Sequence, residues 1–395
     1  GVWSLVLDEL SIVFTEPSSA IRGSTDDRRP DWLPDARLNI VDSCLDGPDD
    51  APAIIWGSPD GIVTWSVGDL RAAVARFASG FSEAGYVPGD RIAVAMPMTP
   101  EAVVAYLGTI AAGGVVVSIA DSFSASELAK RLQIGNARGV VTVDHFTRAG
   151  RQIDLYAKVR EADAPTAVVI AGGTSQAPLR AGDIAWDALL SDREEFPSVS
   201  QSADGLANVL FSSGTTGTPK AIPWTHTTPI KCAADGHFHQ DIREGDVVAW
   251  PTNIGWMMGP WLIFASLINH ATMALYEGSP GGPGFARFVE RAGVNVLGVV
   301  PSLVRAWRSS GACEGSDWSG VRVLSSTGEP SGAEDYLWLM SRTGYRAPVI
   351  EYCGGTEIGG GHATGTVVQP AAPATFSTAA LGIGMAVMDE QGLEV

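Results

Sequence analysis

Short segments that are apolar throughout recur along this chain of 395 residues, and helix-like segments separate them. A strand that is apolar on both faces has to be covered on both sides, which is typical of parallel sheets whose strands are joined by helices. The first such segments are residues 91–96, 115–119, 140–143 and 168–171. They predict a doubly wound α/β unit.

Helix boundary signals lie between these segments. Thr99 is placed to cap a helix that begins with Pro100 and is closed by Gly113. Ser124 and Glu127 have the spacing of a capping box, in which each side chain bonds the backbone of the other residue. Both signals agree with an alternation of strands and helices.

A second series of apolar segments follows a polar stretch at residues 191–204. Its members are residues 209–211, 247–250, 294–300, 321–325 and 349–352. A chain of this length accommodates two or three structural units, so we expect two doubly wound, mostly parallel ones. The expected units are an N-terminal extension at 1–48, a first α/β subdomain at 49–200 and a second at 201–362.

The chain is acidic, with a formal net charge of −18. Such a surface argues against nucleic acid or an anionic membrane as a partner. The four cysteines are scattered and form no metal-binding or disulfide pattern. No apolar run approaches the ~20 residues that a membrane-spanning helix needs. We therefore expect a protein of a reducing compartment with small-molecule ligands, and the oligomeric state stays open.

A polar loop follows the apolar segment 206–211. Glycines let a backbone turn tightly and bring its N–H groups against a polyanion, while hydroxyl groups and a lysine add donors and charge. The residues with these properties are Ser212, Ser213, Gly214, Thr215, Thr216, Gly217 and Lys220. They predict a cradle for the phosphates of a nucleoside triphosphate.

Two widespread nucleotide motifs do not account for this loop. A Walker loop requires Gly-Lys followed by Ser or Thr, whereas Pro219 precedes Lys220 and Ala221 follows it. A dinucleotide fingerprint is missing as well, since Val387 stands where the third glycine would follow Gly384. Composition alone favours a solvated linker.

Further motifs follow the loop in a fixed order. They are Gly-Glu-Pro at 328–330 and Glu-Tyr-Cys-Gly-Gly-Thr-Glu at 351–357. Together they resemble the motifs of the adenylate-forming enzymes, the superfamily of acyl-CoA synthetases, luciferases and peptide-synthetase adenylation domains. Segments 37–45 and 255–259 are most similar to those of its acetyl-CoA synthetase branch. The resemblance extends from about residue 32 to the last residue.

The resemblance implies a two-step reaction with ATP, Mg²⁺ and coenzyme A. A carboxylate attacks the α-phosphate of ATP to give acyl-adenylate and pyrophosphate, and coenzyme A then displaces AMP. The residues implied for catalysis are Thr215, Lys220, Thr356 and Glu357. Those implied around the adenine are Gly328, Glu329, Pro330, Glu351, Tyr352 and Cys353. Glu357 is the expected metal ligand, because Mg²⁺ prefers carboxylate, phosphate and water oxygens.

Arg148 and Arg151 resemble an element that pairs with the nucleotide phosphates of coenzyme A in the acetyl-CoA synthetase branch. Arginine suits this task because its planar fork donates two hydrogen bonds to one phosphate. The alternative for two arginines at this spacing is the solvated start of a helix.

The resemblance also identifies an acyl pocket, formed by Trp256, Met257, Met258, Thr327 and Gly354. In acetyl-CoA synthetases a tryptophan at the position of Gly354 limits the acid to short chains. Glycine removes that wall here, and flexible methionines suit an adaptable pocket. We expect a medium, long or aryl-bearing acid; the alternative is that these residues only pack the core.

Three histidines, at positions 226, 237 and 239, lie close together in the sequence. They lack acidic or cysteine companions at the spacing of a metal site. A solvated turn is the expected setting for them.

The mobile C-terminal domain of the family has no counterpart in the sequence, and residues 363–395 resemble the start of a small β-rich subdomain. We therefore expect a truncated large domain of an AMP-forming acyl-CoA synthetase, in the cytoplasm or the peroxisome. It is expected to bind ATP and acyl-adenylate but to turn over poorly. The alternatives are a non-catalytic nucleotide- or acyl-binding module and a luciferase-type or carrier-loading enzyme.

Overall fold

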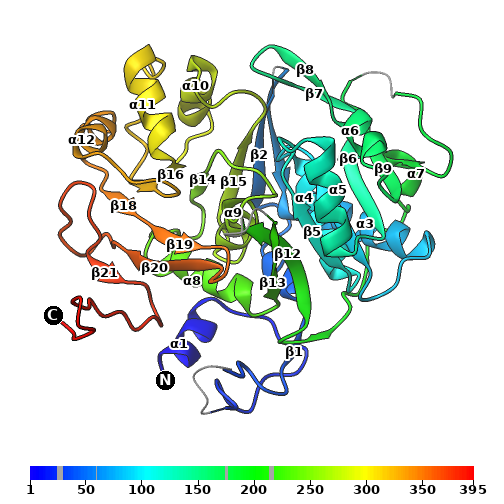
Figure 1. Cartoon of the computed structure of the whole chain (residues 1–395), viewed down its shortest axis with the longest axis horizontal. Helices are drawn as coiled ribbons and strands as arrows, with labels where there is room; N and C mark the ends of the chain where they lie inside the picture. Colours follow the sequence, from blue (N-terminus) through cyan, green and yellow to red (C-terminus); the bar gives the residue numbers. More distant parts are fainter. Residues whose placement is uncertain (25–29, 59, 174–176, 213–217) are drawn as a thin grey trace.

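The computed structural model describes residues 1–24, 30–58, 60–173, 177–212 and 218–395. Within these residues, two seven-stranded sheets form the centre of the molecule (Figure 1). Neighbouring strands in both sheets are parallel, apart from one antiparallel hairpin at an edge of each sheet. The predicted fold class, with two mostly parallel α/β units packed together, is confirmed.

The first sheet has the strand order β10-β9-β6-β4-β5-β12-β13. Its strands are β4 (Arg91–Ala95), β5 (Val115–Ile119), β6 (Gly139–Val143), β9 (Thr166–Ile170), β10 (Ile184–Ala185), β12 (Leu206–Ser212) and β13 (Lys220–Thr225). The second sheet has the order β18-β17-β16-β14-β15-β2-β3. Its strands are β2 (Pro52–Ser58), β3 (Gly61–Ser66), β14 (Val247–Ala249), β15 (Thr272–Tyr276), β16 (Val296–Val299), β17 (Val323–Ser326) and β18 (Val349–Glu351).

The order of the strands along the chain does not decide which of the two sheets they join. The apolar segment 209–211 was expected to begin the second unit, but β12 pairs with β5 of the first sheet, with Val209 opposite Val117. Conversely, the early strand β2 pairs with β15 of the second sheet. The assignment of segment 209–211 to the second unit was wrong. Both sheets are covered by helices on both faces, so an apolar strand is compatible with either of them. The boundaries expected at residues 48, 200 and 362 remain predictions.

Helices form three layers around the two sheets. Those between the sheets are α2 (Ile40–Cys44), α3 (Val67–Glu83), α4 (Pro100–Ala111), α8 (Thr228–Phe238) and α9 (Met258–Leu267). The outer face of the first sheet carries α5 (Ala125–Gly135) and α6 (Leu155–Glu161). The outer face of the second carries α10 (Pro283–Arg291), α11 (Pro301–Ser310) and α12 (Ala333–Ser341).

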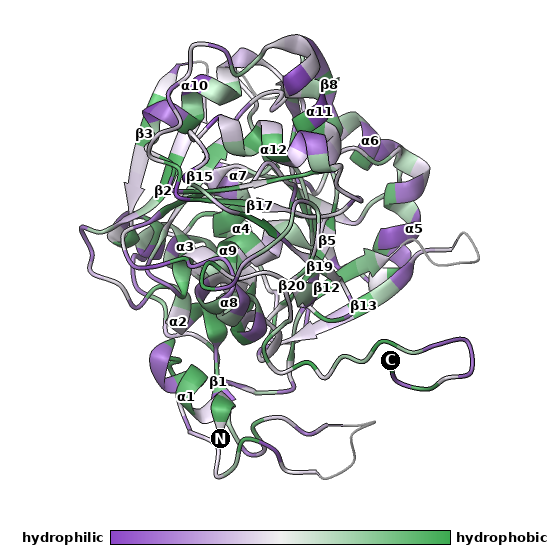
Figure 2. Cartoon of the chain, turned by 90° about the vertical axis from the view of Figure 1, so that its left-hand side faces the viewer, coloured by the Kyte–Doolittle hydropathy of each residue, from purple (hydrophilic) through white to green (hydrophobic). Residues whose placement is uncertain are grey.

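The largest apolar core lies in the central helical layer. Tyr106 of α4 and Phe264 of α9 meet edge to face, with ring centroids 5.8 Å apart, and so join the two halves. The hydrophobic colouring concentrates on the strands and on these central helices (Figure 2). Within the described residues, no helix combines the length and apolar character that crossing a membrane requires.

The local helix signals are largely confirmed. The Thr99 side chain accepts a hydrogen bond from the Ala102 N–H at 3.3 Å, and Gly113 follows α4 with a φ of +77°. Ser124 caps α5 in the same way, through the Glu127 N–H. The Glu127 carboxylate does not complete the box, because it binds Lys130 and Arg131 one turn further along.

Smaller elements complete the fold. They are α1 (Val2–Glu9), β1 (Arg37–Leu38), β7 (His145–Arg148), β8 (Arg151–Asp154), α7 (Trp186–Leu189) and β11 (Gln201–Ser202). After β18 the chain enters a small antiparallel sheet of β19 (Cys353–Gly355), β20 (Gly360–Thr364) and β21 (Thr378–Ala379). This small sheet therefore starts within the 351–357 motif, before residue 363, where the β-rich region was expected to begin.

The expected solvated turn of histidines is wrong. His226 and His239 are both buried. The His226 Nδ1 accepts the Ile40 N–H at 3.2 Å, and His239 bonds the Gly365 carbonyl and the Leu381 N–H. These rings therefore join distant segments of the chain, which their spacing in the sequence does not reveal.

Candidate functional site

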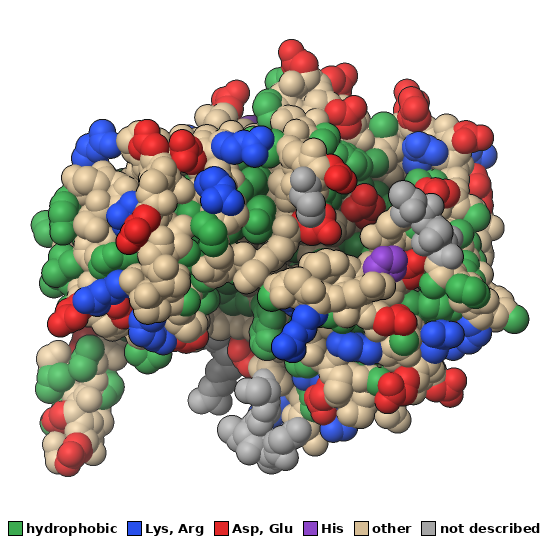
Figure 3. All heavy atoms as spheres, turned by 90° about the horizontal axis from the view of Figure 1, so that it is seen from above, with side chains coloured by type: hydrophobic (Ala, Val, Ile, Leu, Met, Phe, Trp, Pro, Cys, Tyr) green, Lys and Arg blue, Asp and Glu red, His purple; other side chains and the backbone are tan. Residues whose placement is uncertain are grey.

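A cleft of about 1270 Å³ opens where the parallel strands of both sheets end. Its walls come from the segments that follow β4, β5, β14, β15, β17 and β18. The carboxyl ends of parallel strands are where open α/β sheets bind ligands. Seen from above, the molecule is hollowed between its two halves, with acidic side chains beside the hollow (Figure 3). The cleft is therefore the candidate site.

The cleft brings together most of the site residues that the sequence predicts. Those that line it are Arg148, Trp256, Met257, Met258, Thr327, Gly328, Glu329, Pro330, Glu351, Tyr352, Cys353, Gly354 and Thr356. Four predicted residues are described but do not line it, namely Arg151, Ser212, Lys220 and Glu357. The remaining ones, Ser213, Gly214, Thr215, Thr216 and Gly217, lie outside the described residues.

The Gly-Glu-Pro turn is held against the start of α11. Gly328 has a φ of +90°, which favours glycine at this position. The Glu329 carboxylate accepts hydrogen bonds from the Ser302 hydroxyl at 2.7 Å and the Ser302 N–H at 3.0 Å, and Arg305 lies beside it. These donors hold the pKa of Glu329 below its usual range. The turn is thus fixed at the edge of the cleft.

Glu351 places a buried carboxylate in the cleft wall. Its side chain is 6% exposed, and burial raises its pKa despite a hydrogen bond from Ser331. Among the described residues, its Oε1 atom has no hydrogen-bond partner. A buried acceptor without a partner costs free energy unless a ligand satisfies it. Because this Oε1 atom is itself buried, a donor on a bound molecule reaches it only when the Glu351 side chain turns toward the cleft.

An ion pair beneath the cleft supports the 351–357 motif. Asp235 of α8 is fully buried and binds Lys231 one turn earlier. The Tyr352 hydroxyl donates to Asp235 at 2.7 Å, and the Gly361 N–H donates to the same oxygen at 2.8 Å. Asp235 thereby ties α8 to both ends of the segment that carries Thr356 and Glu357.

Two further contacts hold the same segment from below. The Trp224 indole N–H donates to the Thr356 carbonyl at 2.8 Å, and the Cys232 thiol donates to the Gly359 carbonyl at 3.0 Å. Asp235 and Trp224 were missed in the sequence. The available signal for Asp235 was a carboxylate inside an apolar helical run, Cys232 to Gly236.

Arg148 has a protein partner on the cleft wall. Its guanidinium donates two hydrogen bonds to the buried Asp121, one of them at 3.0 Å. Lys158 adds a positive charge by donating to the Asp121 and Phe123 carbonyls. Arg151 lies opposite Arg148 in the β7–β8 hairpin and is exposed. The alternative of a solvated helix start is wrong for these arginines, since both lie on strands.

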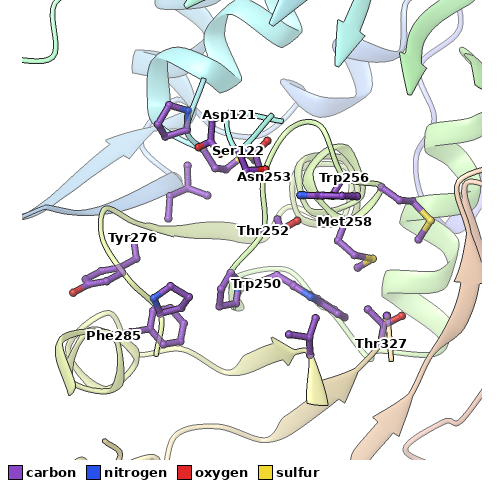
Figure 4. Close-up of a pocket in the computed structure, with 18 of the residues that line it drawn as sticks. Asp121, Ser122, Trp250, Thr252, Asn253, Trp256, Met258, Tyr276, Phe285 and Thr327 are labelled. Atoms are coloured by element: carbon purple, nitrogen blue, oxygen red, sulfur yellow. The ribbon is translucent and has the colours of Figure 1, made fainter. Parts of the chain in front are cut away.

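The cleft has two distinct ends (Figure 4). Trp250, Met258 and Thr327 lie around one end, while Tyr276 and Phe285 lie at the other. The Thr327 hydroxyl donates to the Tyr352 carbonyl, which joins the first end to the 351–357 motif. Trp250 was not identified from the sequence, where it reads only as the last residue of an apolar strand.

Gly354 is closely packed against the neighbouring strand. A Cβ atom at this position would lie 2.1 Å from the Gly360 carbonyl oxygen of β20. A side chain here therefore requires the β19–β20 hairpin to move. A protein with a large side chain at this position therefore needs a different backbone path in this hairpin, in addition to the change of residue.

Replacing Gly354 by alanine is expected to lower the free energy of unfolding by about 1–3 kcal/mol, the usual cost of overpacking. Urea titration of both proteins measures the difference. Gly384→Ala is the matched control, since a Cβ there meets no atom within 4 Å. Equal stability of the Gly354 and Gly384 variants would contradict the close packing of β19 on β20.

The described residues contain no group of three or more His, Cys, Asp or Glu side chains that could hold a metal ion. Mg²⁺ needs fewer ligands from the protein, because one or two carboxylates are enough when phosphate oxygens and waters complete its coordination shell. Glu357 is exposed beside the cleft residue Thr356. This single carboxylate fits an ion that arrives with a nucleotide.

Comparisons with known proteins agree with this geometry. Residues 42–395 match the family model described as AMP-binding enzyme. The chain is 47% identical to "Probable acyl-activating enzyme 17, peroxisomal" of Arabidopsis thaliana, over 98% of this chain and 56% of that protein. It is 46% identical to "Hexanoyl-CoA synthase" of Cannabis sativa, over 99% of this chain and 57% of that protein.

A solved structure shares the fold over the whole chain. The acetoacetyl-CoA synthetase from Streptomyces lividans superposes with a TM-score of 0.92 at 28% sequence identity, covering 100% of this chain and 63% of that one. The chain thus spans a little over half the length of the curated relatives named here. It belongs to the AMP-binding enzyme family, the adenylate-forming group that contains the acyl-CoA synthetases.

Proposed function

We propose that the protein containing this chain activates a carboxylic acid with ATP and transfers the acyl group to coenzyme A. One observation carries the proposal: a single cleft joins the 328–330 turn and the buried Glu351 to an apolar end at Trp250, Met258 and Thr327. A nucleotide with a polar base and an acyl chain requires this combination of surfaces.

In the first step a carboxylate oxygen attacks the α-phosphate of ATP, and pyrophosphate leaves. Lys220, Thr356 and residues 213–217 are proposed to stabilise the charge that develops on the phosphates, since no protein nucleophile is needed. Mg²⁺, held by Glu357, would neutralise part of the phosphate charge. In the second step the thiol of coenzyme A loses its proton, attacks the acyl carbonyl and releases AMP.

Coenzyme A is proposed to place its nucleotide phosphates near Arg148 and Arg151. Arg148 already pairs with Asp121 on the cleft wall, so a phosphate has to share or replace this carboxylate. Lys158 lies close enough to add positive charge. Arg148, Arg151 and Lys158 together therefore supply positive charge beside the cleft in a chain that is acidic as a whole.

The acid is proposed to be longer than acetate. The volume of the cleft and the hexanoyl group in the name of one relative support this size. The compartment is proposed to be the cytoplasm or the peroxisome, the latter named in one relative.

Glu351 is proposed to turn toward the cleft and accept a hydrogen bond from the exocyclic amine of adenine, which would satisfy the Oε1 atom that has no partner among the described residues. Wild-type protein is then expected to bind AMP more tightly than IMP, whose base carries a carbonyl at that position. Hydrogen bonds to charged groups contribute about 1.5–3 kcal/mol, or roughly 10- to 100-fold in Kd. Calorimetric titration with both nucleotides measures the ratio.

The Glu351→Gln variant tests the assignment, because an amide can accept from adenine or donate to the carbonyl of IMP. The Kd values of this variant for AMP and for IMP are expected to differ by no more than a few-fold. Glu357→Gln is the matched control and is expected to keep the wild-type ratio. An unchanged preference for AMP in Glu351→Gln would rule out this contact and remove the support for an adenine site here.

A further inference from the structure

A tryptophan lies flat on a glycine at the apolar end of the cleft. Trp250 follows β14, and its side chain is 4% exposed and lines the cleft. A Cβ atom at Gly298 of β16 would lie 1.9 Å from Cδ2 and 2.1 Å from Cε3 of the indole. The ring therefore occupies the space that a side chain at residue 298 would need.

The strand register explains this contact. In the parallel pair of β14 and β16, Val248 lies opposite Val296 and Ala249 opposite Leu297. The next step along both strands places Trp250 beside Gly298. Side chains alternate between the two faces of a strand, so residue 298 shares a face with Val300, which lines the cleft.

The indole has little room to move away from the cleft. Trp261 is fully buried and meets Trp250 edge to face, with ring centroids 5.2 Å apart. Trp261 in turn packs on Tyr352 at 5.8 Å. The open side of the Trp250 ring faces Met258 and Thr327 across the cleft (Figure 4).

We propose that Gly298 is a specificity-determining residue, because it lets the Trp250 indole lie back on the sheet and so sets the depth of the acyl chamber. The chamber is the end of the cleft bordered by Trp250, Met258 and Thr327. This inference rests on the proposed function, since it needs an acyl group in that end of the cleft. Nucleotide binding does not depend on it.

A side chain at residue 298 has a defined consequence. Carbon atoms in contact lie about 3.5–4.0 Å apart, so a Cβ at 1.9 Å moves the indole by roughly 2 Å. Trp261 and the sheet block the other directions, so the ring enters the chamber. The chamber then becomes too short for the acyl chains that the wild-type protein accepts.

The experiment measures the binding of non-hydrolysable acyl-adenylate mimics with acetyl, hexanoyl and decanoyl groups to wild type and Gly298→Ala. A methylene in an apolar pocket changes binding by roughly 10- to 200-fold. Gly298→Ala is expected to bind the mimic that wild type binds best with an affinity at least about 10-fold lower. Its affinity for AMP is expected to stay within about 2-fold of the wild-type value.

Gly139→Ala is the matched control. Gly139 is also a strand glycine facing an aromatic ring, with a Cβ that would lie 2.6 Å from the Tyr86 hydroxyl, and neither residue lines the cleft. This variant is expected to keep the wild-type order of the three mimics. A loss of similar size in both variants would mean that general destabilisation, and not the chamber, causes the effect.

Two Trp250 variants complete the test. The double variant Gly298→Ala/Trp250→Leu is expected to regain binding of the mimics with longer acyl groups, because leucine leaves room for the added methyl group. Trp250→Leu alone is expected to shift the preference toward decanoyl, which tests the chamber even if Gly298→Ala fails to fold. An unchanged order of mimics in Gly298→Ala or in Trp250→Leu overturns the inference. Failure of wild type to bind any mimic overturns the proposed function instead.

Discussion

Replacing Asp235 by alanine is expected to lower the free energy of unfolding by about 3–5 kcal/mol, the cost of leaving one charge of a buried ion pair without its partner. Asp235 is fully buried, and Lys231 is mostly buried beside it. The change also leaves the Tyr352 hydroxyl and the Gly361 N–H without their acceptor. Denaturant titration of the purified chain measures the loss.

The same change is expected to weaken the binding of adenylate mimics, because Asp235 holds both ends of the segment with Thr356 and Glu357. Glu334→Ala provides the control, since Glu334 pairs with Arg308 at the surface. Exposed ion pairs contribute about 0–1 kcal/mol, so this variant should unfold almost like wild type. An Asp235 variant as stable as the Glu334 variant would contradict the buried network.

Acidification from pH 7 to pH 4 is expected to remove about 3 kcal/mol of stability through His226 alone. Burial lowers the pKa of this histidine in the folded chain to about 4, whereas the unfolded value is about 6.5. Below pH 6.5 the unfolded chain binds a proton that the folded chain does not, so stability falls as the pH falls. The loss levels off only below pH 4, where the folded chain also binds the proton.

The His226→Asn variant separates this effect from other groups. Asparagine has an oxygen that can accept the Ile40 N–H in place of Nδ1, but it does not titrate in this range. His237 and His239 also have lowered pKa values and contribute to both proteins alike. The difference in unfolding free energy between wild type and variant should therefore change by about 3 kcal/mol between pH 7 and pH 4. A constant difference would contradict the assignment to His226.

The sequence predicts those parts of the fold that depend on neighbouring residues. Thr99, Pro100 and Gly113 bound α4 as expected, since capping acts within one turn of a helix. The partner of an apolar strand is not encoded locally. This is why β12 was assigned to the wrong sheet and why the pairing of β2 with β15 was not foreseen.

The site was predictable where it consists of motifs at strand ends. The 328–330 turn and the 351–356 segment meet in one cleft because β17 and β18 are parallel neighbours. Residues that act across the fold were not predictable. Asp235 bonds Gly361 across 126 residues, and the contact of Trp250 with Gly298 depends on the register of two strands.

Binding of an acyl-adenylate in the cleft is the property on which the proposed function depends. The most direct test is the unfolding of the wild-type chain in the presence of a non-hydrolysable hexanoyl-adenylate mimic and Mg²⁺. A ligand at about 100 times its Kd stabilises a two-state fold by about 2.7 kcal/mol, and we expect a shift of this size that grows with ligand concentration. An unfolding curve that stays the same at every concentration of the mimic would contradict binding of an acyl-adenylate in this cleft.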